Sequence, residues 1–383
     1  MSGGVDSSVA AYLLKQKGYE VEGVSFVLWE ARLKPAATAC CSFDARDSAA
    51  QSAEALGIPL RTIDVRGAFY DKVIDPFVDA YRRGLTPNPC ILCNRHIKFP
   101  YLLKAADETG GEFIATGHYA RIARGKEQGA WGIEHNVKSE GQRVGLEGLE
   151  TGGEWQEVNS GEQGGQTLLK GKDKKKDQSY VLYVLTKDQV PRLVLPLGEY
   201  TKDQVRDTAR SLGLPAADRP ESQEICFIED NDYCRFLETL SPEVLQPGPV
   251  IGPDGKTIGT HQGIYRYTIG QRKGLGIASL EPRFVTKIDT VRNAVHVGNR
   301  EDAMVRKITT DEINWLLRPE SSAFRADVKV RSMMEAMPAS VGIFGERAMV
   351  TFDEPQWAPA PGQSAVFYDG DVVLGGGVII AEA

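Results

Sequence analysis

The sequence predicts an α/β protein in which a parallel-sheet domain is followed by a small central β-rich domain and a C-terminal β-barrel. Two observations carry this prediction. In the first half of the chain, helical patterns alternate with short apolar runs, an order typical of a parallel sheet covered on both faces. After about residue 220, glycine, proline and short β-branched runs dominate, which indicates small β modules. With 383 residues, the chain is long enough for two or three domains.

The first half contains three units in which a helix precedes a strand. Each helix is indicated by apolar residues spaced three and four apart, and each strand by a short β-branched run. The units are helix 9–17 with strand 21–27, helix 44–56 with strand 60–65, and helix 101–108 with strand 113–116. Ligands of such sheets bind at the carboxyl ends of the strands, so we expect a site there.

The alternation stops between about residues 125 and 166. This stretch is rich in glycine and polar residues and has little apolar periodicity, so we expect a flexible insertion. Regular structure is expected to resume at Leu168. A further helix is predicted from Thr201 to Leu212, because Thr201 and Gln204 have the spacing of a capping box and Gly213 follows.

Strands are predicted along the remainder of the chain. Asp369 and Gly370 separate the last two predicted strands, 365–368 and 372–380, and indicate a hairpin, since this pair tolerates positive φ. The predicted domains are residues 1–218, 219–302 and 303–383. The predicted strands are 255–259, 285–288, 294–297, 328–330, 349–352, 365–368 and 372–380.

Composition excludes several classes of protein. No apolar run approaches the roughly 20 residues needed to cross a bilayer, and no signal-peptide pattern is seen. The six cysteines are interpreted as reduced thiols of a cytoplasmic protein. The net charge of −7 argues against a nucleic-acid binder, but basic runs at 82–83, 95–98 and 170–176 permit an RNA partner.

The segment Ser2-Gly3-Gly4-Val5-Asp6-Ser7-Ser8 leads directly into the first helix. Its glycines allow close approach of the backbone to an anion, and its hydroxyls and helix-start amides supply donors, which suits a pyrophosphate group. Asp6 would repel phosphate unless a cation such as Mg²⁺ lies between them. The Gly-Lys-Ser/Thr ending of a Walker loop is absent. A simple serine–glycine helix cap is the alternative interpretation.

Two segments place cysteines in informative surroundings. Cys90 and Cys93 have the C-x-x-C spacing that can bring two sulfurs to one centre, and Cys226 stands alone between polar and apolar residues. Zinc binding, redox chemistry and buried structural cysteines all remain open. No second C-x-x-C follows and the chain has five histidines, so a closed zinc site lacks obvious ligands. The remaining cysteines, Cys40, Cys41 and Cys234, are expected to be packing residues.

The loop at the start resembles that of the PP-loop ATP pyrophosphatases, which have an adenine nucleotide alpha hydrolase-like fold. Nearly the whole chain outside the glycine-rich insertion resembles the MnmA family of tRNA-uridine 2-sulfurtransferases. In this fold the loop follows a buried strand, yet here it begins at residue 1, so we expect an internal start or a missing first strand. The matching segments are 2–8, 86–94, 97–99, 115–120, 176–180, 222–227, 267–274 and 361–368.

The resemblance implies ATP-dependent 2-thiolation of the wobble uridine of tRNA, through adenylation of the base and sulfur transfer from a cysteine persulfide. Cys93 would be the nucleophile and Cys226 the persulfide carrier, joined by a disulfide during the cycle. ATP would be bound by Ser2, Gly3, Gly4, Val5, Asp6, Ser7, Phe26 and Gly117. The target base would meet Asn88, Pro89 and Cys90. The tRNA would be contacted by His118, Lys176, Asp177, Gln178, Arg331, Ser332 and Gln363.

Two positions depart from the family pattern. Many members have Asp where this chain has Cys90, and Arg331-Ser332-Met333-Met334 replaces an Arg-Tyr-Arg pattern in a late strand. With three thiols, Cys90, Cys93 and Cys226 could instead hold an iron–sulfur cluster. The other implied cofactors are ATP and Mg²⁺, and the implied partners are tRNA and a persulfide-donating sulfur-relay protein or cysteine desulfurase.

Two other functions are kept as alternatives. One is a PP-loop enzyme that thiolates or ligates another RNA position or a metabolite. The other is a non-catalytic, redox-sensitive RNA-binding protein.

Overall fold

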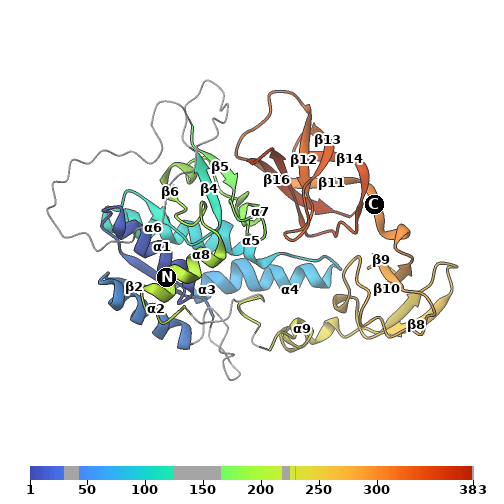
Figure 1. The fold of residues 1–383 in the computed structure, drawn as a ribbon. Helices are drawn as coiled ribbons and strands as arrows, with labels where there is room; N and C mark the ends of the chain where they lie inside the picture. Colours follow the sequence, from blue (N-terminus) through green and yellow to red (C-terminus); the bar gives the residue numbers. More distant parts are fainter. Residues whose placement is uncertain (30–42, 124–164, 218–224, 229, 382–383) are drawn as a thin grey trace.

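The chain forms an α/β module, a small central β module and a β-barrel (Figure 1). The computed structural model describes residues 1–29, 43–123, 165–217, 225–228 and 230–381. The predicted insertion, up to residue 164, lies outside these ranges, as do Cys40, Cys41, Gln223 and Glu224. Within them, no helix is long and apolar enough to span a membrane.

The α/β module begins with the predicted helix–strand order. Helix α1 (Val5–Gln16) precedes β1 (Gly23–Val27), and α2 (Phe43–Leu56) precedes β2 (Leu60–Asp64), which runs parallel to β1. Helix α6 (Phe99–Thr109) precedes β3 (Ile114–Ala115), which pairs in parallel with β6 (Leu193–Val194). The described parallel sheet therefore consists of two pairs, with element ends a few residues from those predicted.

Two π-helical turns were not predicted. One continuous helical run contains α3 (Arg66–Phe69), η1 (Tyr70–Ile74) and α4 (Asp75–Arg82). A second run contains α5 (Pro89–Cys93) and η2 (Asn94–Lys98) and continues into α6. The π turns η1 and η2 pack against each other. Such turns inside helices are frequent at functional sites, and here η2 directly follows the C-x-x-C motif.

The capping box predicted for α8 (Lys202–Ser211) is confirmed. The amide of Gln204 donates to Thr201 Oγ1 at 3.3 Å, and the amide of Thr201 donates to Gln204 Oε1 at 2.8 Å. Gly213 has the left-handed backbone expected just beyond the helix. Other helices up to residue 244 are α7 (Ser179–Leu182), η3 (Val190–Arg192), α9 (Tyr233–Leu240) and η4 (Pro242–Val244).

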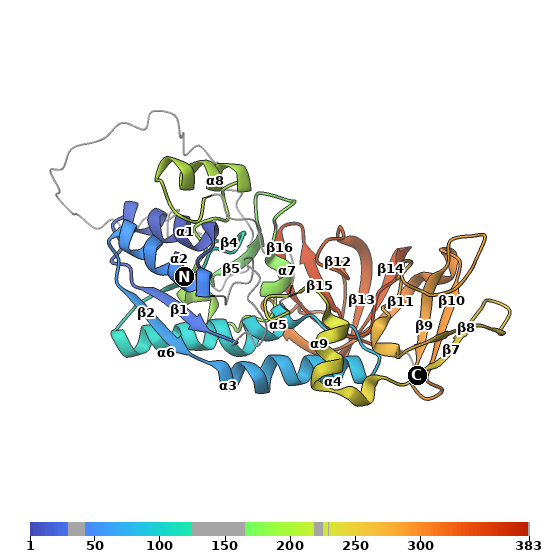
Figure 2. The same cartoon turned by 90° about the horizontal axis from the view of Figure 1, so that it is seen from below.

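The central module lies at the end of the molecule farthest from α1 (Figure 2). Its four-stranded sheet has the order β8-β7-β10-β9 and packs around Val250, Val285 and Val295. The strand expected at 255–259 is corrected to Thr257–His261, because Gly255 adopts a left-handed turn with φ 77°. The elements are β7 (Gly248–Ile251), β8 (Thr257–His261), η5 (Ile264–Arg266), β9 (Phe284–Asp289) and β10 (Ala294–Gly298).

The C-terminal barrel has strand order β11-β14-β13-β12-β15-β16 and is closed by pairing of β11 with β16. The predicted hairpin is confirmed, with Asp369 opposite Val372 and Gly370 at φ 55°. The expected strand location of Arg331–Met334 is wrong: these residues turn between β12 and β13. The elements are η6 (Glu301–Ala303), β11 (Met304–Trp315), β12 (Ala323–Lys329), β13 (Met337–Phe344), β14 (Arg347–Trp357), β15 (Ser364–Asp369) and β16 (Val372–Ile380).

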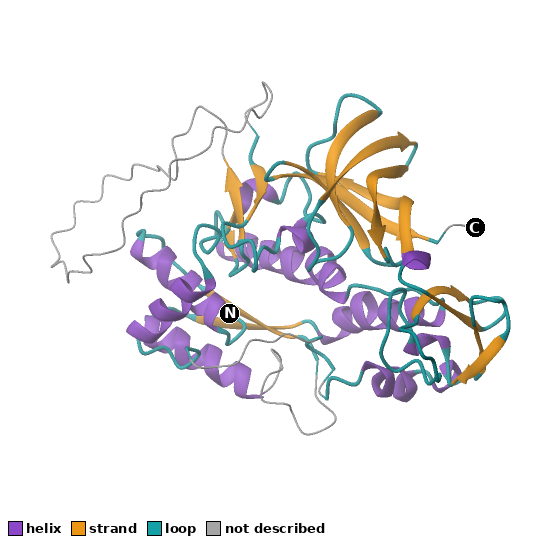
Figure 3. Cartoon of the chain, turned by 45° about the vertical axis from the view of Figure 1, so that its right-hand side comes forward, coloured by secondary structure: helices purple, strands orange, loops and turns teal. Residues whose placement is uncertain are grey.

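A hairpin of the α/β module extends the barrel sheet. Strands β4 (Ala120–Ala123) and β5 (Thr167–Lys170) pair with each other, and Leu169 of β5 lies opposite Val372 of β16. Helices are concentrated in the α/β module and strands in the other two, as Figure 3 shows. This hairpin is therefore the strand connection between the first and last parts of the chain.

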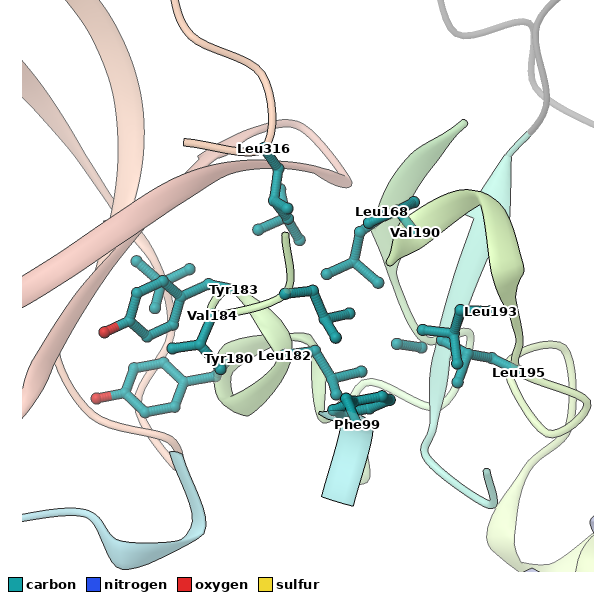
Figure 4. Packing of buried hydrophobic residues seen from close by; sticks show 14 of the residues in the cluster. Phe99, Leu168, Tyr180, Leu182, Tyr183, Val184, Val190, Leu193, Leu195 and Leu316 are labelled. Carbon is teal, nitrogen blue, oxygen red and sulfur yellow. The ribbon is translucent and has the colours of Figure 1, made fainter. Parts of the chain in front are cut away.

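The α/β module and the barrel also share a hydrophobic core (Figure 4). Tyr180 and Tyr183 of the first module are buried in one cluster with Leu316 and Val366 of the barrel. Both tyrosine hydroxyls bond to Ser364 at 2.9 Å, Tyr180 donating to its carbonyl oxygen and Tyr183 paired with its hydroxyl. Burial of rings whose polar ends are satisfied fixes the barrel against the module that carries the C-x-x-C motif.

Candidate active site

The C-x-x-C motif forms one turn of helix whose start is well defined. Asn88 caps this turn, since its Oδ1 accepts a hydrogen bond of 3.1 Å from the amide of Cys90. Pro89 occupies the first helical position, where its missing N–H is not needed. Cys90 is exposed and Cys93 is buried, with 5% of its surface accessible. The two sulfurs of the motif therefore face different surroundings.

Cys226 lies in a tight turn anchored by buried residues. The amide of Ile228 donates to the carbonyl of Ile225 at 3.0 Å. Phe227 is buried, and its ring centroid lies 5.3 Å from that of Phe77. Cys226 packs against the same buried cluster that contains Cys93. Cys93 and Cys226, which are 133 positions apart in the sequence, therefore border the same buried cluster.

The described cysteines are thiols in this structure. No disulfide joins two of the cysteines that the structure describes. The described residues also contain no group of three or more cysteine, histidine or acidic side chains placed to hold a metal ion. Cys234, expected to be a packing residue, packs half-buried against the cluster around Cys93.

Basic groups lie on the helical run just after Cys93. Burial, and then the charges of Arg95 and Lys72, lower the pKa of His96, so its ring favours the neutral form. Arg95 contacts Glu312 of the barrel at 3.3 Å. Glu312 has a left-handed backbone, φ 51°, at a bulge in β11. The charge near the C-x-x-C motif is thus partly set by a barrel side chain that the sequence did not indicate.

The serine–glycine loop is held by bonds between its side chains and its own backbone. Ser7 Oγ and Ser8 Oγ both donate to the carbonyl of Gly4, at 3.0 and 3.2 Å. Ser48 Oγ of α2 donates to the carbonyl of Gly3, which has φ 73°. The loop backbone therefore has a defined shape at the start of α1, which suits an anion-binding turn.

Gly117 packs directly against this loop. A Cβ at Gly117 would lie 2.7 Å from the carbonyl carbon of Asp6 and 2.9 Å from the amide nitrogen of Ser7. Phe26, the other residue expected near adenosine, lies on β1. It meets Tyr101 edge-on at 6.5 Å and packs against the cluster that contains Cys93. The serine–glycine loop (residues 2–8), expected to bind phosphate and called the phosphate loop below, and the buried cluster around Cys93 are thus both built on the α/β module.

Asp6 is the centre of a charged network at the loop. Its Oδ1 accepts hydrogen bonds of 2.7 Å from both Tyr119 and Lys202, and its Oδ2 accepts one of 2.8 Å from Lys202. The side chain of Lys202 is 8% exposed and that of Asp6 35%. Lys202 was not identified as a site residue from the sequence. Its position next to the helix cap Thr201 was the only local feature that distinguished it, and that feature does not indicate a partner.

The residues expected to touch tRNA are connected to the same network. Gln178 Oε1 accepts from the amide of Tyr119 at 2.9 Å, and the amide of Gln178 donates to the carbonyl of Tyr119 at 2.8 Å. Asp177 accepts from the amides of Gly171 and Ser179, so its carboxylate supports the turn that carries Gln178. Lys176 is partly exposed on that turn.

His118 lies between the loop network and the helix that follows the C-x-x-C motif. Its ring stacks on Phe99 at 6.0 Å, and its Nδ1 is 2.8 Å from Thr116 Oγ1. Burial, together with the charge of Lys98, lowers the pKa of His118 to about 3. The ring is therefore neutral at physiological pH and interacts through hydrogen bonding and stacking.

The barrel residues expected to touch tRNA make contacts between modules. Arg331 Nη2 donates to the carbonyls of Ile269 at 2.8 Å and Ala358 at 2.7 Å, which bridges the central module to the barrel. Ser332 is half-buried in the turn that follows. Gln363 Nε2 donates at 2.8 Å to the carbonyl of Thr86, just ahead of the C-x-x-C turn. These contacts connect the barrel to the site.

Comparison with known proteins agrees with this arrangement. The profile described as "tRNA methyl transferase HUP domain" matches residues 1–230, "tRNA methyl transferase PRC-barrel domain" matches 235–299, and "Aminomethyltransferase beta-barrel domain" matches 305–379. The chain is 43% identical to the tRNA-specific 2-thiouridylase MnmA of Carboxydothermus hydrogenoformans, covering 99% of this chain and 96% of that protein. It is 42% identical to the protein of that name from Moorella thermoacetica, covering 100% and 99%. The Clostridioides difficile protein is 39% identical, covering 99% and 96%.

Proposed function

Because the chain belongs to the MnmA family of tRNA-specific 2-thiouridylases, we propose that it uses ATP to place sulfur at the 2-position of the wobble uridine of tRNA. One structural observation supports assigning this activity to particular residues of the chain. Cys93 lies in, and Cys226 packs against, one buried cluster of the module that also contains the serine–glycine loop. The reaction needs a site that binds ATP to activate the base, and a cysteine that carries sulfur beside a second thiol. The loop is proposed to supply the first, and Cys226 with Cys93 the second.

ATP supplies the leaving group of the reaction. The 2-oxygen of uridine leaves poorly, and transfer of AMP to it, with release of pyrophosphate, turns it into a good leaving group. The residues proposed to hold ATP are Ser2, Gly3, Gly4, Val5, Asp6, Ser7, Phe26 and Gly117. The shaped backbone of the loop and the close packing of Gly117 against it support this assignment. Mg²⁺ is proposed to bind together with ATP at this loop.

Sulfur is proposed to arrive as a persulfide on Cys226, supplied by a sulfur-relay protein or a cysteine desulfurase. In one route, the Cys93 thiolate attacks the Cys226 sulfur, and the hydrosulfide released attacks C2 of the base and displaces AMP. In the other, the terminal sulfur attacks C2, AMP leaves, and Cys93 then attacks the Cys226 sulfur to release thiouridine. Both routes leave a Cys93–Cys226 disulfide, which an external thiol must reduce before the next cycle.

The remaining residues are proposed to hold the RNA. Asn88, Pro89 and exposed Cys90 form the helix start nearest Cys93 and are proposed to meet a target base flipped out of its stack. The proposed tRNA contacts are His118, Lys176, Asp177, Gln178, Arg331, Ser332 and Gln363. The bonds of Gln178 and Gln363 to the backbone near the loop and near the C-x-x-C turn support a positioning role. The three domains are proposed to span residues 1–218, 219–302 and 303–383.

The proposal is tested by sulfur incorporation into unmodified tRNA with ATP, Mg²⁺ and a persulfide donor. The product is read on a mercury-containing gel that retards thiolated RNA, for the wild type and for Cys93→Ser, Cys226→Ser and Cys234→Ser. Cys234→Ser is the matched control, because Cys234 packs on the same cluster but has no proposed chemical role. Retardation with wild type and Cys234→Ser, lost in the other two variants, would support the proposed roles.

Iron and sulfide analysis of anaerobically purified protein separates the two sulfur chemistries. The persulfide route predicts a colourless, iron-free and fully active enzyme. Activity that requires iron would replace the persulfide route with a cluster. If no tRNA is thiolated while RNA still binds, the non-catalytic RNA-binding alternative takes precedence.

A further inference from the structure

The phosphate loop contains a negative charge at the place where a polyphosphate is expected. Asp6 lies in the first turn of α1, between the glycines of the loop and its serines. Two like charges about 4 Å apart repel strongly enough to weaken binding by about fivefold in bulk water and about 1,000-fold at the dielectric of a protein surface, and a partly exposed Asp6 lies between these limits. An uncompensated Asp6 would therefore oppose the binding that the rest of the loop favours.

Lys202 compensates this charge. Its ammonium donates to both carboxylate oxygens of Asp6, at 2.7 and 2.8 Å, and the hydroxyl of Tyr119 donates to Oδ1. Lys202 is almost fully buried, and an ammonium buried without a negative partner would be strongly unfavourable. The Lys202–Asp6 ion pair is therefore a largely buried structural contact of the loop rather than a solvent-exposed ion pair.

The fold also fixes where this ammonium can lie. Lys202 is the first residue of α8, next to the capping residue Thr201, and its amide donates to Asp173 at 3.0 Å. Helix α8 packs against α1, whose first turn contains Asp6. Both ends of the ion pair are thus held by helix starts that pack together, so the pair can keep its position when a ligand enters the loop.

We propose that Lys202 is the resident counter-ion of the phosphate loop, which cancels the charge of Asp6 and lets the loop bind pyrophosphate without a divalent cation. This inference rests on the proposed function, since it takes ATP as the ligand. Lys202 acts through Asp6 and is a positioning residue. Mg²⁺ and the Lys202 ammonium are then alternative partners for the same carboxylate, so loss of the lysine makes binding depend on Mg²⁺.

The test is calorimetric titration of inorganic pyrophosphate and of ATP into the full chain, with EDTA or with Mg²⁺. The variants are Lys202→Met, Asp6→Asn and the double variant, with Lys202→Arg as the charge-conserving change and Lys104→Met as an exposed helical control. In EDTA, Lys202→Met should bind pyrophosphate about 10- to 100-fold more weakly than wild type. Mg²⁺ should restore most of this loss. The double variant should bind within about threefold of Asp6→Asn, and Lys202→Arg should keep most of the affinity.

Two results would overturn the inference. One is pyrophosphate affinity in EDTA that Lys202→Met leaves unchanged. The other is an equal loss from Lys202→Met in the Asp6→Asn background, which would mean that the ammonium does not act through Asp6. If Lys202→Met fails to fold, the comparison of Asp6→Asn with the double variant still decides the question. If wild type binds ATP and the variants bind pyrophosphate and ATP with unchanged affinity, the inference alone is rejected. If wild type binds no ATP, the proposed function is rejected.

Discussion

Replacement of Gly117 by alanine should disturb the phosphate loop through a single methyl group. The added Cβ would lie 2.7 Å from the carbonyl carbon of Asp6, 2.9 Å from its oxygen and 2.9 Å from the amide nitrogen of Ser7. All three atoms belong to the backbone, so no side-chain rotation can relieve the contact. Ordinary carbon contacts begin near 3.4 Å, so the loop must move by about 0.7 Å relative to Gly117.

The magnitude follows from this displacement. Overpacking of a well-packed site costs about 1–3 kcal/mol of unfolding free energy. A shift of somewhat less than 1 Å at a substrate-positioning loop is expected to lower kcat/KM for ATP by about 10- to 100-fold. Both effects should appear together, because the same backbone displacement causes them.

The assay combines urea unfolding with steady-state thiolation at varied ATP. Gly67→Ala is the matched control: Gly67 lies in helix α3, and a Cβ there would have no neighbour within 4 Å. The control should be neutral or slightly stabilising, by up to about 1 kcal/mol. If Gly117→Ala keeps the ATP dependence and the stability of wild type, the loop is not packed against Gly117 as described, and the reasoning fails.

Three further predictions concern residues outside the loop itself. Arg331→Met should lower the unfolding free energy by about 2–4 kcal/mol in urea, because two carbonyls of different modules lose their donor; a change below about 0.5 kcal/mol would contradict the bridge. Because the folded pKa of His118 is lowered to about 3, its contribution to stability is complete above pH 6.5 and is lost as pH falls from 6.5 toward 3. Between pH 7.5 and pH 5, His118→Gln should therefore lose about 2 kcal/mol less stability in urea than wild type, and parallel losses would refute this. Gln363→Ala removes the bond to the Thr86 carbonyl and should slow thiolation about fivefold with the KM for ATP unchanged; a selective rise in that KM would contradict a positioning role near the C-x-x-C turn.

Local signals predicted a large part of the fold. The capping box of Thr201 and Gln204 and the Asp369-Gly370 hairpin are interactions between residues close in sequence, so short-range patterns were sufficient. Strand β13 was missed because it contains Pro338 and Gly342, which normally argue against a strand. Pro338 is nevertheless accommodated opposite Asp327 of β12. Pairing within the barrel here outweighs the low strand propensity of proline and glycine.

The parts of the site that were missed depend on long-range contacts. Lys202 meets Asp6 across 196 positions, and Glu312 meets Arg95 across 217, so no window of sequence contains either pair. The π turn η2 after Cys93 is likewise packed against η1 of another helical run. Spacing and local surroundings singled out Cys93 and Cys226, the family resemblance assigned their roles, and the fold places both at one buried cluster.

The core shared by Tyr180, Tyr183 and the barrel has a consequence for synthesis of the protein on the ribosome. The N-terminal module is translated first, yet the partners of its tyrosines and of strand β5 lie between residues 364 and 380. At about 5–20 residues per second, the last 150 or so residues take roughly 10–30 s to emerge. Throughout that interval the nascent module exposes an apolar face and an unpaired strand edge, which makes it a natural client for a chaperone.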